Sequence, residues 1–168
     1  MAAIEKVLPE AGLESLEGVE CLILGAGGAA RSIAIGAKDR GAKITISNRT
    51  DERGKCLAAE LGVNFIHWEE REDSGCTVLI NATSVGMHPD VDISPMSTRV
   101  LERSGLVFDA VYNPPLTSLL QYACDAGVPT ASGVDMFVHQ AVMQFELWTG
   151  GSAPAGLMRE KILSRLTA

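Results

Sequence analysis

The chain has 168 residues, of which 46% are hydrophobic, and a formal net charge of −7. This size and composition are typical of one globular domain. The negative charge disfavours nonspecific attraction to nucleic acid or anionic membranes. No stretch approaches the roughly 18 unbroken apolar residues of a membrane span, and the opening segment "MAAIEKVLPE" lacks the apolar core of a signal peptide. We therefore expect a cytoplasmic protein.

In chain order, the apolar run at 19–24 predicts a buried strand, and small and apolar residues at helical spacing predict a helix at 29–41. A β-branched strand at 42–47 and a helix at 50–62 follow, and residues 63–68 and 76–83 predict two further strands with the acidic segment "EEREDSG" between them. The longest irregular stretch, 86–99, indicates a loop with one helical turn.

The second half continues the alternation with a strand at 106–112, a helix at 117–127, a short strand at 128–132 and helices at 134–148 and 153–166. Repeated strand–helix alternation predicts an α/β fold, a doubly wound Rossmann-type parallel sheet with helices on both faces in a single domain. The four cysteines and three histidines are scattered, without C-x-x-C or zinc-like spacing. We therefore expect no metal site.

The stretch "ILGAGGAARS" places a glycine-rich turn between the first strand and the first helix. Gly25, Gly27 and Ala30 fit G-x-G-x-x-A, in which the first glycine makes the tight turn, the second lets a pyrophosphate approach and the small third residue packs helix against strand. Backbone amides at the helix start would receive the phosphates. The alternative is a tight strand–helix junction that needs small residues only for packing.

The end of the second strand reads "SNRT", where an NAD-binding fold usually has an acidic residue for the ribose 2′-hydroxyl. Asn48 is neutral and can donate, Arg49 offers a bidentate fork or can lie over adenine, and Thr50 adds a hydroxyl. With Arg53 one helical turn on, the segment favours the 2′-phosphate of NADP over NAD. The alternative is a helix cap followed by a solvated arginine.

Three later stretches, "NATSVGM", "FDAVYNPPLTSLL" and "SGVDMFVHQAVMQFELWTG", together with "GAGGAA" and "NRTDER", resemble the NADP-binding domain of shikimate dehydrogenase. The resemblance covers roughly residues 2–166 and is closer to the version fused to 3-dehydroquinate dehydratase. It implies NADP(H)-dependent interconversion of 3-dehydroshikimate and shikimate, in the pathway to chorismate and the aromatic amino acids.

The resemblance also implies residue roles. The expected cofactor-binding residues, from the pyrophosphate through the 2′-phosphate to the nicotinamide, are Gly25, Ala26, Gly27, Gly28, Ala29, Asn48, Arg49, Thr50, Arg53, Thr83, Ser84, Val85, Ala110, Gly133 and Met136. The expected substrate-binding residues are Tyr112 and Gln140. Each has a structural alternative: "NATS" as a plain turn, Tyr112 as a strand-end aromatic, Gln140 as a solvated residue and Met136 as core. We expect the neighbouring Phe137 in the core.

The chain departs from the family at its start, because only 24 residues precede Gly25. Family members carry an N-terminal substrate domain there, with the Lys and Asp that handle the proton of hydride transfer. We therefore expect no catalytic residues here, and a piece of a longer or split enzyme. The expected division is 1–17 hinge helix and linker, 18–150 NADP-binding domain and 151–168 C-terminal helix.

The apolar stripe of this last helix would cover the missing substrate domain, or drive homodimerisation in isolation. Alternatives of the same class are an NAD-dependent quinate/shikimate dehydrogenase and the NADP domain of glutamyl-tRNA reductase. The latter accounts for the glycine turn and "NRT" but not for the later motifs. A non-catalytic sensing module is the alternative of another class.

Overall fold

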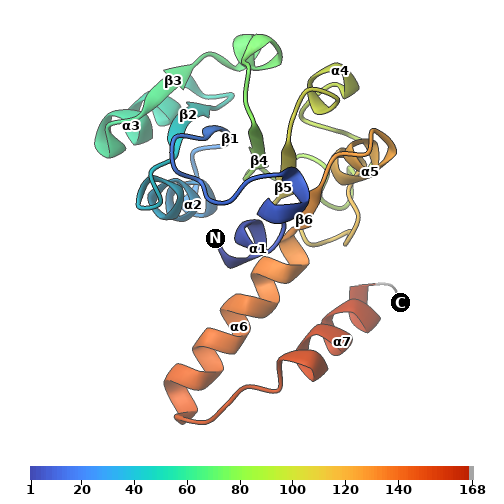
Figure 1. Ribbon diagram of the computed structural model, residues 1–168. Helices are drawn as coiled ribbons and strands as arrows, with labels where there is room; N and C mark the ends of the chain where they lie inside the picture. The colour runs from blue at the N-terminus through green and yellow to red at the C-terminus, as the bar shows by residue number, and fades with distance from the viewer. Residues whose placement is uncertain (167–168) are drawn as a thin grey trace.

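The computed structural model describes residues 1–166. Its six parallel strands form one sheet in the order β3-β2-β1-β4-β5-β6, with the direction of strand addition reversing beside β1 (Figure 1). The strands are β1 (Glu20–Leu24), β2 (Lys43–Ser47), β3 (Asn64–Ile66), β4 (Val78–Asn81), β5 (Leu106–Asp109) and β6 (Thr130–Ser132). This is the dinucleotide-binding order, and the predicted doubly wound α/β fold is confirmed.

The α-helices are α1 (Ala2–Glu5), α2 (Gly28–Lys38), α3 (Asp51–Leu61), α4 (Thr98–Leu101), α5 (Ser118–Asp125), α6 (Gly133–Thr149) and α7 (Ala155–Leu166), and the 3-10 helices are η1 (Leu8–Ala11) and η2 (Trp68–Asp73). The strand predicted at 63–68 is shorter than expected. Its last residue opens η2, because the His67 side chain and Glu70 form a reciprocal capping box that starts a helical turn. No helix in residues 1–166 is long and apolar enough to cross a membrane.

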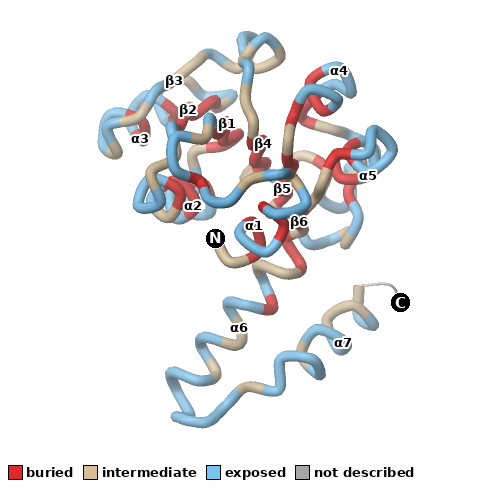
Figure 2. The backbone as a smooth tube through the Cα atoms, viewed as in Figure 1, coloured by how far each residue is buried: buried red, intermediate tan, exposed pale blue. Residues whose placement is uncertain are grey.

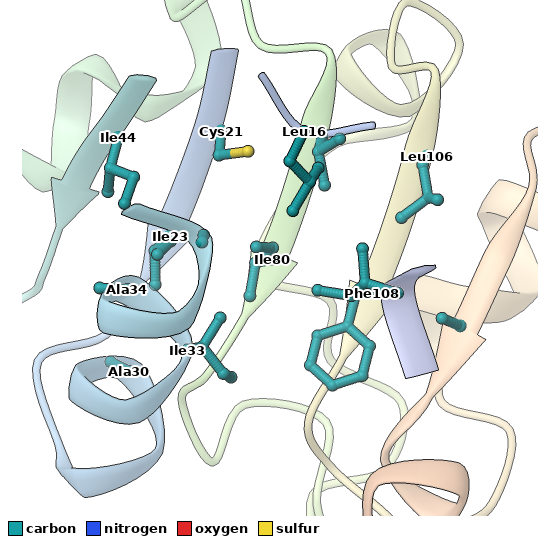
Figure 3. Packing of buried hydrophobic residues seen from close by; sticks show 14 of the residues in the cluster. Leu16, Cys21, Ile23, Ala30, Ile33, Ala34, Ile44, Ile80, Leu106 and Phe108 are labelled. Atoms are coloured by element: carbon teal, nitrogen blue, oxygen red, sulfur yellow. The ribbon is translucent and has the colours of Figure 1, made fainter. Parts of the chain in front are cut away.

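Alternate residues of the central strands point to opposite faces of the sheet, and each face has its own core. Cys21 and Ile23 pack with α1, α2 and α3, whereas Leu22 and Leu24 pack with α4 and α5. Figure 3 shows the first core, where Ile33 of α2 lies close to the sheet residues. Burial on both faces explains why these strands are continuously apolar.

Helices α6 and α7 form a hairpin that extends from the body of the domain (Figure 1). An ion pair of 3.2 Å between Arg159 of α7 and Asp135 of α6 joins the two helices. Figure 2 shows that burial is concentrated around the sheet, whereas the outer part of α6 and most of α7 are exposed. Leu147 and Trp148 are 81% and 77% exposed, so the hairpin carries an open apolar surface.

Helix α6 begins at Gly133, directly after β6, and passes very close to the chain that leaves β5. A Cβ at Gly133 would lie 2.4 Å from the carbonyl oxygens of both Ala110 and Val111. Backbone atoms cannot move aside as a flexible side chain can. The start of α6 therefore requires a glycine.

We expect Gly133→Ala to lower the free energy of unfolding by about 1–3 kcal/mol, because overpacking must displace one of the two backbone segments. Gly156→Ala in α7 is the matched control, since no described atom lies within 4 Å of its Cβ position, and alanine is the better helix former. Chemical denaturation of both variants measures the effect. Equal stability of the two variants would contradict this packing.

Candidate functional site

Three chain segments leave the sheet side by side at its carboxyl edge. Leu24 pairs with Ser47 of β2 and with Asn81 of β4 in the parallel register. The amide of Gly25 donates to the Ser47 carbonyl at 2.8 Å, and the amide of Ala82 donates to the Leu24 carbonyl at 2.8 Å. The glycine turn, the "NRT" segment and the "NATS" segment therefore start at one level of the sheet.

The glycines of the turn do different things. Gly25 has φ +113°, and a Cβ there would lie 2.8 Å from the Ala82 carbonyl oxygen, so the fold itself requires this glycine. Gly27 has an ordinary φ of −89°, and no described atom lies within 4 Å of a Cβ at Gly27 or Gly28. Packing explains Gly25 but leaves Gly27 and Gly28 unexplained. Their bare positions fit the close approach of a ligand.

The N-terminus of α2 opens directly onto this turn. Its N-cap is Gly27, and no described side chain caps the helix. The first-turn amides and the positive end of the helix dipole are therefore available to an anion. Glycine is itself a common N-cap residue, but it offers no side-chain acceptor to these amides, as Ser, Thr, Asp or Asn would. The open N-terminus and the bare glycines together leave free amide donors and space for an anion such as a phosphate.

A cavity of ≈ 560 Å³ lies beside the turn and brings together ten of the predicted cofactor residues. These are Gly25, Ala26, Gly27, Asn48, Arg49, Thr50, Arg53, Thr83, Ser84 and Val85. Three arginines and no Asp or Glu of the described chain line it, although the protein as a whole is acidic. Arg49 and Arg53 make no hydrogen bond or ion pair within residues 1–166 that would neutralise them. The cavity is therefore a local cationic site.

The third arginine, Arg71, was missed by the sequence analysis, as was Trp68 beside it. The Arg71 guanidinium lies 4.3 Å from the centre of the Trp68 ring. Its Nε donates to the Pro95 carbonyl at 2.9 Å and its Nη1 to the Trp68 carbonyl at 2.7 Å. Arg71 thus ties η2 to the irregular 86–99 loop, which closes the far side of the cavity. The sequence did place Trp68 at the end of a predicted strand, at the sheet edge where ligands bind, and this position could have indicated that Trp68 and Arg71 lie near the site.

A larger cavity of ≈ 970 Å³ lies between the start of α2 and α6 and is lined by Gly28, Ala29, Met136 and Gln140. Gly27 faces the smaller cavity and Gly28 the larger one. The two cavities therefore flank the same turn. A long ligand that crosses the turn would have one end in each. Met136 is partly buried and packs against the core, whereas Gln140 is exposed.

Three predicted residues, Ala110, Gly133 and Tyr112, line neither cavity. Ala110 and Gly133 are in close backbone contact where β5 ends and α6 begins. Tyr112 is 41% exposed, and its ring is stacked on Phe137 at 4.9 Å between centroids and 8° between planes. The expectation that Phe137 belongs to the core was wrong. It is 39% exposed, because it lies on the side of α6 that faces Tyr112 rather than the sheet.

A buried polar network lies beneath the cavities. Asp109 at the end of β5 accepts hydrogen bonds from Asn81 Nδ2 and the Val111 amide, both at 2.9 Å, and from Thr117 Oγ1 at 2.6 Å. Asn81, Asp109 and Thr117 are fully buried. Burial raises the pKa of the Asp109 carboxyl to about 6, although the three donors favour its charged form.

Asn81 organises the "NATS" turn from the same network. Its Oδ1 accepts from the Thr83 amide at 3.1 Å and from Thr83 Oγ1 at 2.6 Å, and its Nδ2 donates to the Val85 carbonyl at 3.2 Å. The Val85 amide donates back to Thr83 Oγ1 at 3.1 Å. The segment is therefore a turn, as the structural alternative expected, and it also lines the smaller cavity.

The raised pKa of Asp109 has a consequence for stability. Between the unfolded value near 4 and the folded value of about 6, the native state binds more protons than the unfolded state, so its stability falls as the pH rises. We expect this carboxyl to lower the free energy of unfolding by up to about 3 kcal/mol across that window. Denaturation of the unaltered chain and of Asp109→Asn from pH 4 to 7 measures it. Parallel pH profiles would contradict the assignment.

Known proteins resemble this chain over almost its whole length. Residues 8–85 match the family model of shikimate/quinate 5-dehydrogenase, and residues 133–163 match that of the shikimate 5′-dehydrogenase C-terminal domain. Shikimate dehydrogenase (NADP(+)) of Methanosarcina acetivorans is 40% identical over 97% of this chain and 61% of its own length. The chloroplastic bifunctional 3-dehydroquinate dehydratase/shikimate dehydrogenase of Arabidopsis thaliana is 45% identical over 81% of this chain and 23% of its own.

The fold comparison agrees. A crystal structure of shikimate dehydrogenase in complex with NADP+ superposes with a TM-score of 0.87 and 31% identity, over 99% of this chain and 60% of that one. The chain thus spans about three fifths of the monofunctional relative and of this structure. The ordered motifs, the strand order and both family models agree, and the chain belongs to the shikimate dehydrogenase family.

Proposed function

We propose that this chain is the NADP-binding part of a shikimate dehydrogenase. The observation that carries the proposal is the cavity at the end of β2, which is lined by Arg49, Arg53 and Arg71 without a carboxylate. A 2′-phosphate is doubly charged and accepts several hydrogen bonds, so it fits the guanidinium groups of Arg49 and Arg53, which have no internal partner in the described chain. Arg71 is already bonded to two carbonyls and paired with Glu72 at 3.7 Å, so it adds mainly its positive charge. The neutral Asn48 stands where an acidic residue would repel that phosphate.

The remaining cofactor contacts follow from the positions of the two cavities on either side of the glycine turn. The adenosine end occupies the smaller cavity, and the pyrophosphate crosses the turn at Gly27 and Gly28. The Thr83–Val85 turn, which also lines the smaller cavity, then lies on the path toward the nicotinamide ribose, and the nicotinamide end lies near Ala110, Gly133 and Met136. The open N-terminus of α2 supports the pyrophosphate position, because its amides have no capping side chain among the described residues.

Substrate contacts belong beyond the nicotinamide. Tyr112 and Gln140 lie on the chain after β5 and on α6, and the exposed face of each is open to an additional partner. We assign these two residues to the binding of shikimate or 3-dehydroshikimate. No residue of this chain is assigned to catalysis, so hydride transfer requires a second set of groups that orients the substrate and handles its proton.

The partner that supplies these groups is the rest of the enzyme, either in a longer chain or as a separate subunit. We divide the chain into a hinge segment (1–17), the NADP-binding domain (18–150) and a C-terminal segment (151–168) that covers the partner domain. Leu157 of the C-terminal segment is exposed, as are Leu147 and Trp148 at the end of α6. These exposed apolar residues support a contact with the partner domain, and in isolation they favour a homodimer. The free cysteines of the described chain fit a cytoplasmic location.

Calorimetric titration with NADP and with NAD tests the cofactor assignment. We expect preferential binding of NADP, and Arg49→Ala should weaken NADP binding about ten- to a hundredfold, because a hydrogen-bonded charge partner of the phosphate is lost. Binding of NAD should change less. Arg103→Ala, an exposed charge outside both cavities, is the control. A preference for NAD would favour the NAD-dependent quinate/shikimate alternative.

A second prediction separates the two kinds of glycine. Gly27→Ala should lower the free energy of unfolding by no more than about 1 kcal/mol, since its Cβ meets no described atom and the remaining cost is the poorer N-cap propensity of alanine. The same variant should bind NADP about tenfold or more weakly, because the new methyl group lies in the path of the pyrophosphate.

Gly25→Ala is the matched variant and should mainly lose stability, because of its positive φ and its contact with the Ala82 carbonyl. Denaturation and calorimetry on both variants give the comparison. Unchanged NADP affinity in Gly27→Ala would contradict the proposed position of the pyrophosphate.

A further inference from the structure

The polar network around Asp109 connects two parts of the site that come from different strands. On one side, Asn81 holds the turn that contains Thr83 and Val85. On the other side, the Val111 amide donates to the same Asp109 oxygen, Oδ1, at 2.9 Å. Asn81 Nδ2 and the Val111 amide therefore share one acceptor atom. The Ala110 amide also donates to the Asn81 carbonyl at 2.8 Å, so this carboxylate oxygen adds a side-chain link to a backbone link between the two segments.

The second carboxylate oxygen of Asp109, Oδ2, is also hydrogen-bonded, and this bond holds the carboxylate in place. Thr117 Oγ1 donates to Oδ2 at 2.6 Å and also accepts the Leu120 amide at 3.3 Å, which makes Thr117 the N-cap of α5. Because the carboxylate is held at both ends, its rotation is restricted. Every buried side-chain polar atom of the described residues has a partner. A substitution in the network therefore leaves at least one buried donor or acceptor without a new partner.

The two connected segments lie on the proposed path of the cofactor from the smaller cavity to the nicotinamide end. The 81–85 turn carries Thr83, Ser84 and Val85, and the chain after β5 carries Ala110. The proposed 2′-phosphate contacts come from other elements, namely the end of β2 and the start of α3 with Asn48, Arg49 and Arg53, although these residues line the same cavity as the turn. None of these three side chains is hydrogen-bonded to Asp109 in the described chain.

We infer that Asp109 is a positioning residue for the nicotinamide half of NADP. Its carboxylate fixes the Asn81 side chain, which holds the 81–85 turn, relative to the Val111 amide, and it acts through these two segments without touching the cofactor. The inference rests on the proposed function. It deepens that function by assigning separate control of the two halves of one cofactor site.

The substitution Asp109→Asn tests this role. It keeps the shape of the side chain but presents an amide NH₂ group to a surrounding of donors, so at least one of the three hydrogen bonds is lost. Binding of NADP should weaken about tenfold or more, whereas binding of adenosine 2′,5′-bisphosphate, which lacks the nicotinamide half, should stay within about twofold of the unaltered chain. The ratio of the two affinities, measured by calorimetry, is the readout.

Two further variants keep the test valid if Asp109→Asn folds poorly. Thr117→Val removes one donor to Asp109 and, like Asp109→Asn, should lower the ratio of the affinity for NADP to the affinity for adenosine 2′,5′-bisphosphate. Thr117→Ser keeps the hydroxyl and should leave this ratio as it is in the unaltered chain. Val107→Ala is the control for a general loss of stability. It lies on β5 two residues before Asp109, is buried in the core that packs with α4 and α5, and has no polar side-chain atom that could join the network, so it should leave the ratio unchanged.

The outcomes separate this inference from the proposed function. If the unaltered chain binds neither ligand, the proposed function fails and the inference fails with it. If the unaltered chain binds NADP but Asp109→Asn and Thr117→Val weaken both ligands equally, or neither, Asp109 is only a structural residue and the inference alone is overturned. Equal affinity of the unaltered chain for the two ligands would also overturn it, because the nicotinamide half would then make no contact to position.

Discussion

The position of β1 between β2 and β4 is the constraint on which the rest of the structure depends. Because all three strands are parallel and in register at Leu24, Ser47 and Asn81, the segments that follow them leave the sheet at one level. The sheet reverses its order of strand addition at this point, where doubly wound folds bind their ligands. The glycine turn, the cationic cavity and the Asn81 turn are therefore neighbours because β1, β2 and β4 end at the same level.

Within this site, the residues that the fold itself requires can be distinguished from those that only a bound ligand would require. Gly25 and Gly133 are required by the backbone itself, since a Cβ at either position would clash with carbonyl groups. Gly27, Gly28 and the unpaired Arg49 and Arg53 have no such structural justification in the described chain. An open helix N-terminus and unpaired guanidinium groups offer little to the isolated fold, and they support the proposal that this site binds a dinucleotide phosphate.

The parts of the site that were predictable are those encoded by short segments. The glycine turn, "NRT" and the strand that precedes each of them are local patterns, and both their type and their place at the sheet edge were foreseen. Arg71 reaches the cavity only because the capping box at His67 bends the chain back over Trp68. Phe137 stacks on Tyr112 only because α6 crosses the end of β5. Such contacts depend on tertiary packing, which a single sequence does not reveal.

The central claim, that one NADP molecule extends from the β2 end across the glycine turn to the start of α6, is tested most directly by NMR titration of the isotopically labelled chain. The account predicts saturable amide shifts at Arg49, Gly27 and Met136 with one common dissociation constant. Adenosine 2′,5′-bisphosphate should reproduce the first two shifts and leave the amide of Met136 unchanged. Shifts confined to α6 and α7, or shifts at these three amides with unrelated dissociation constants, would contradict it.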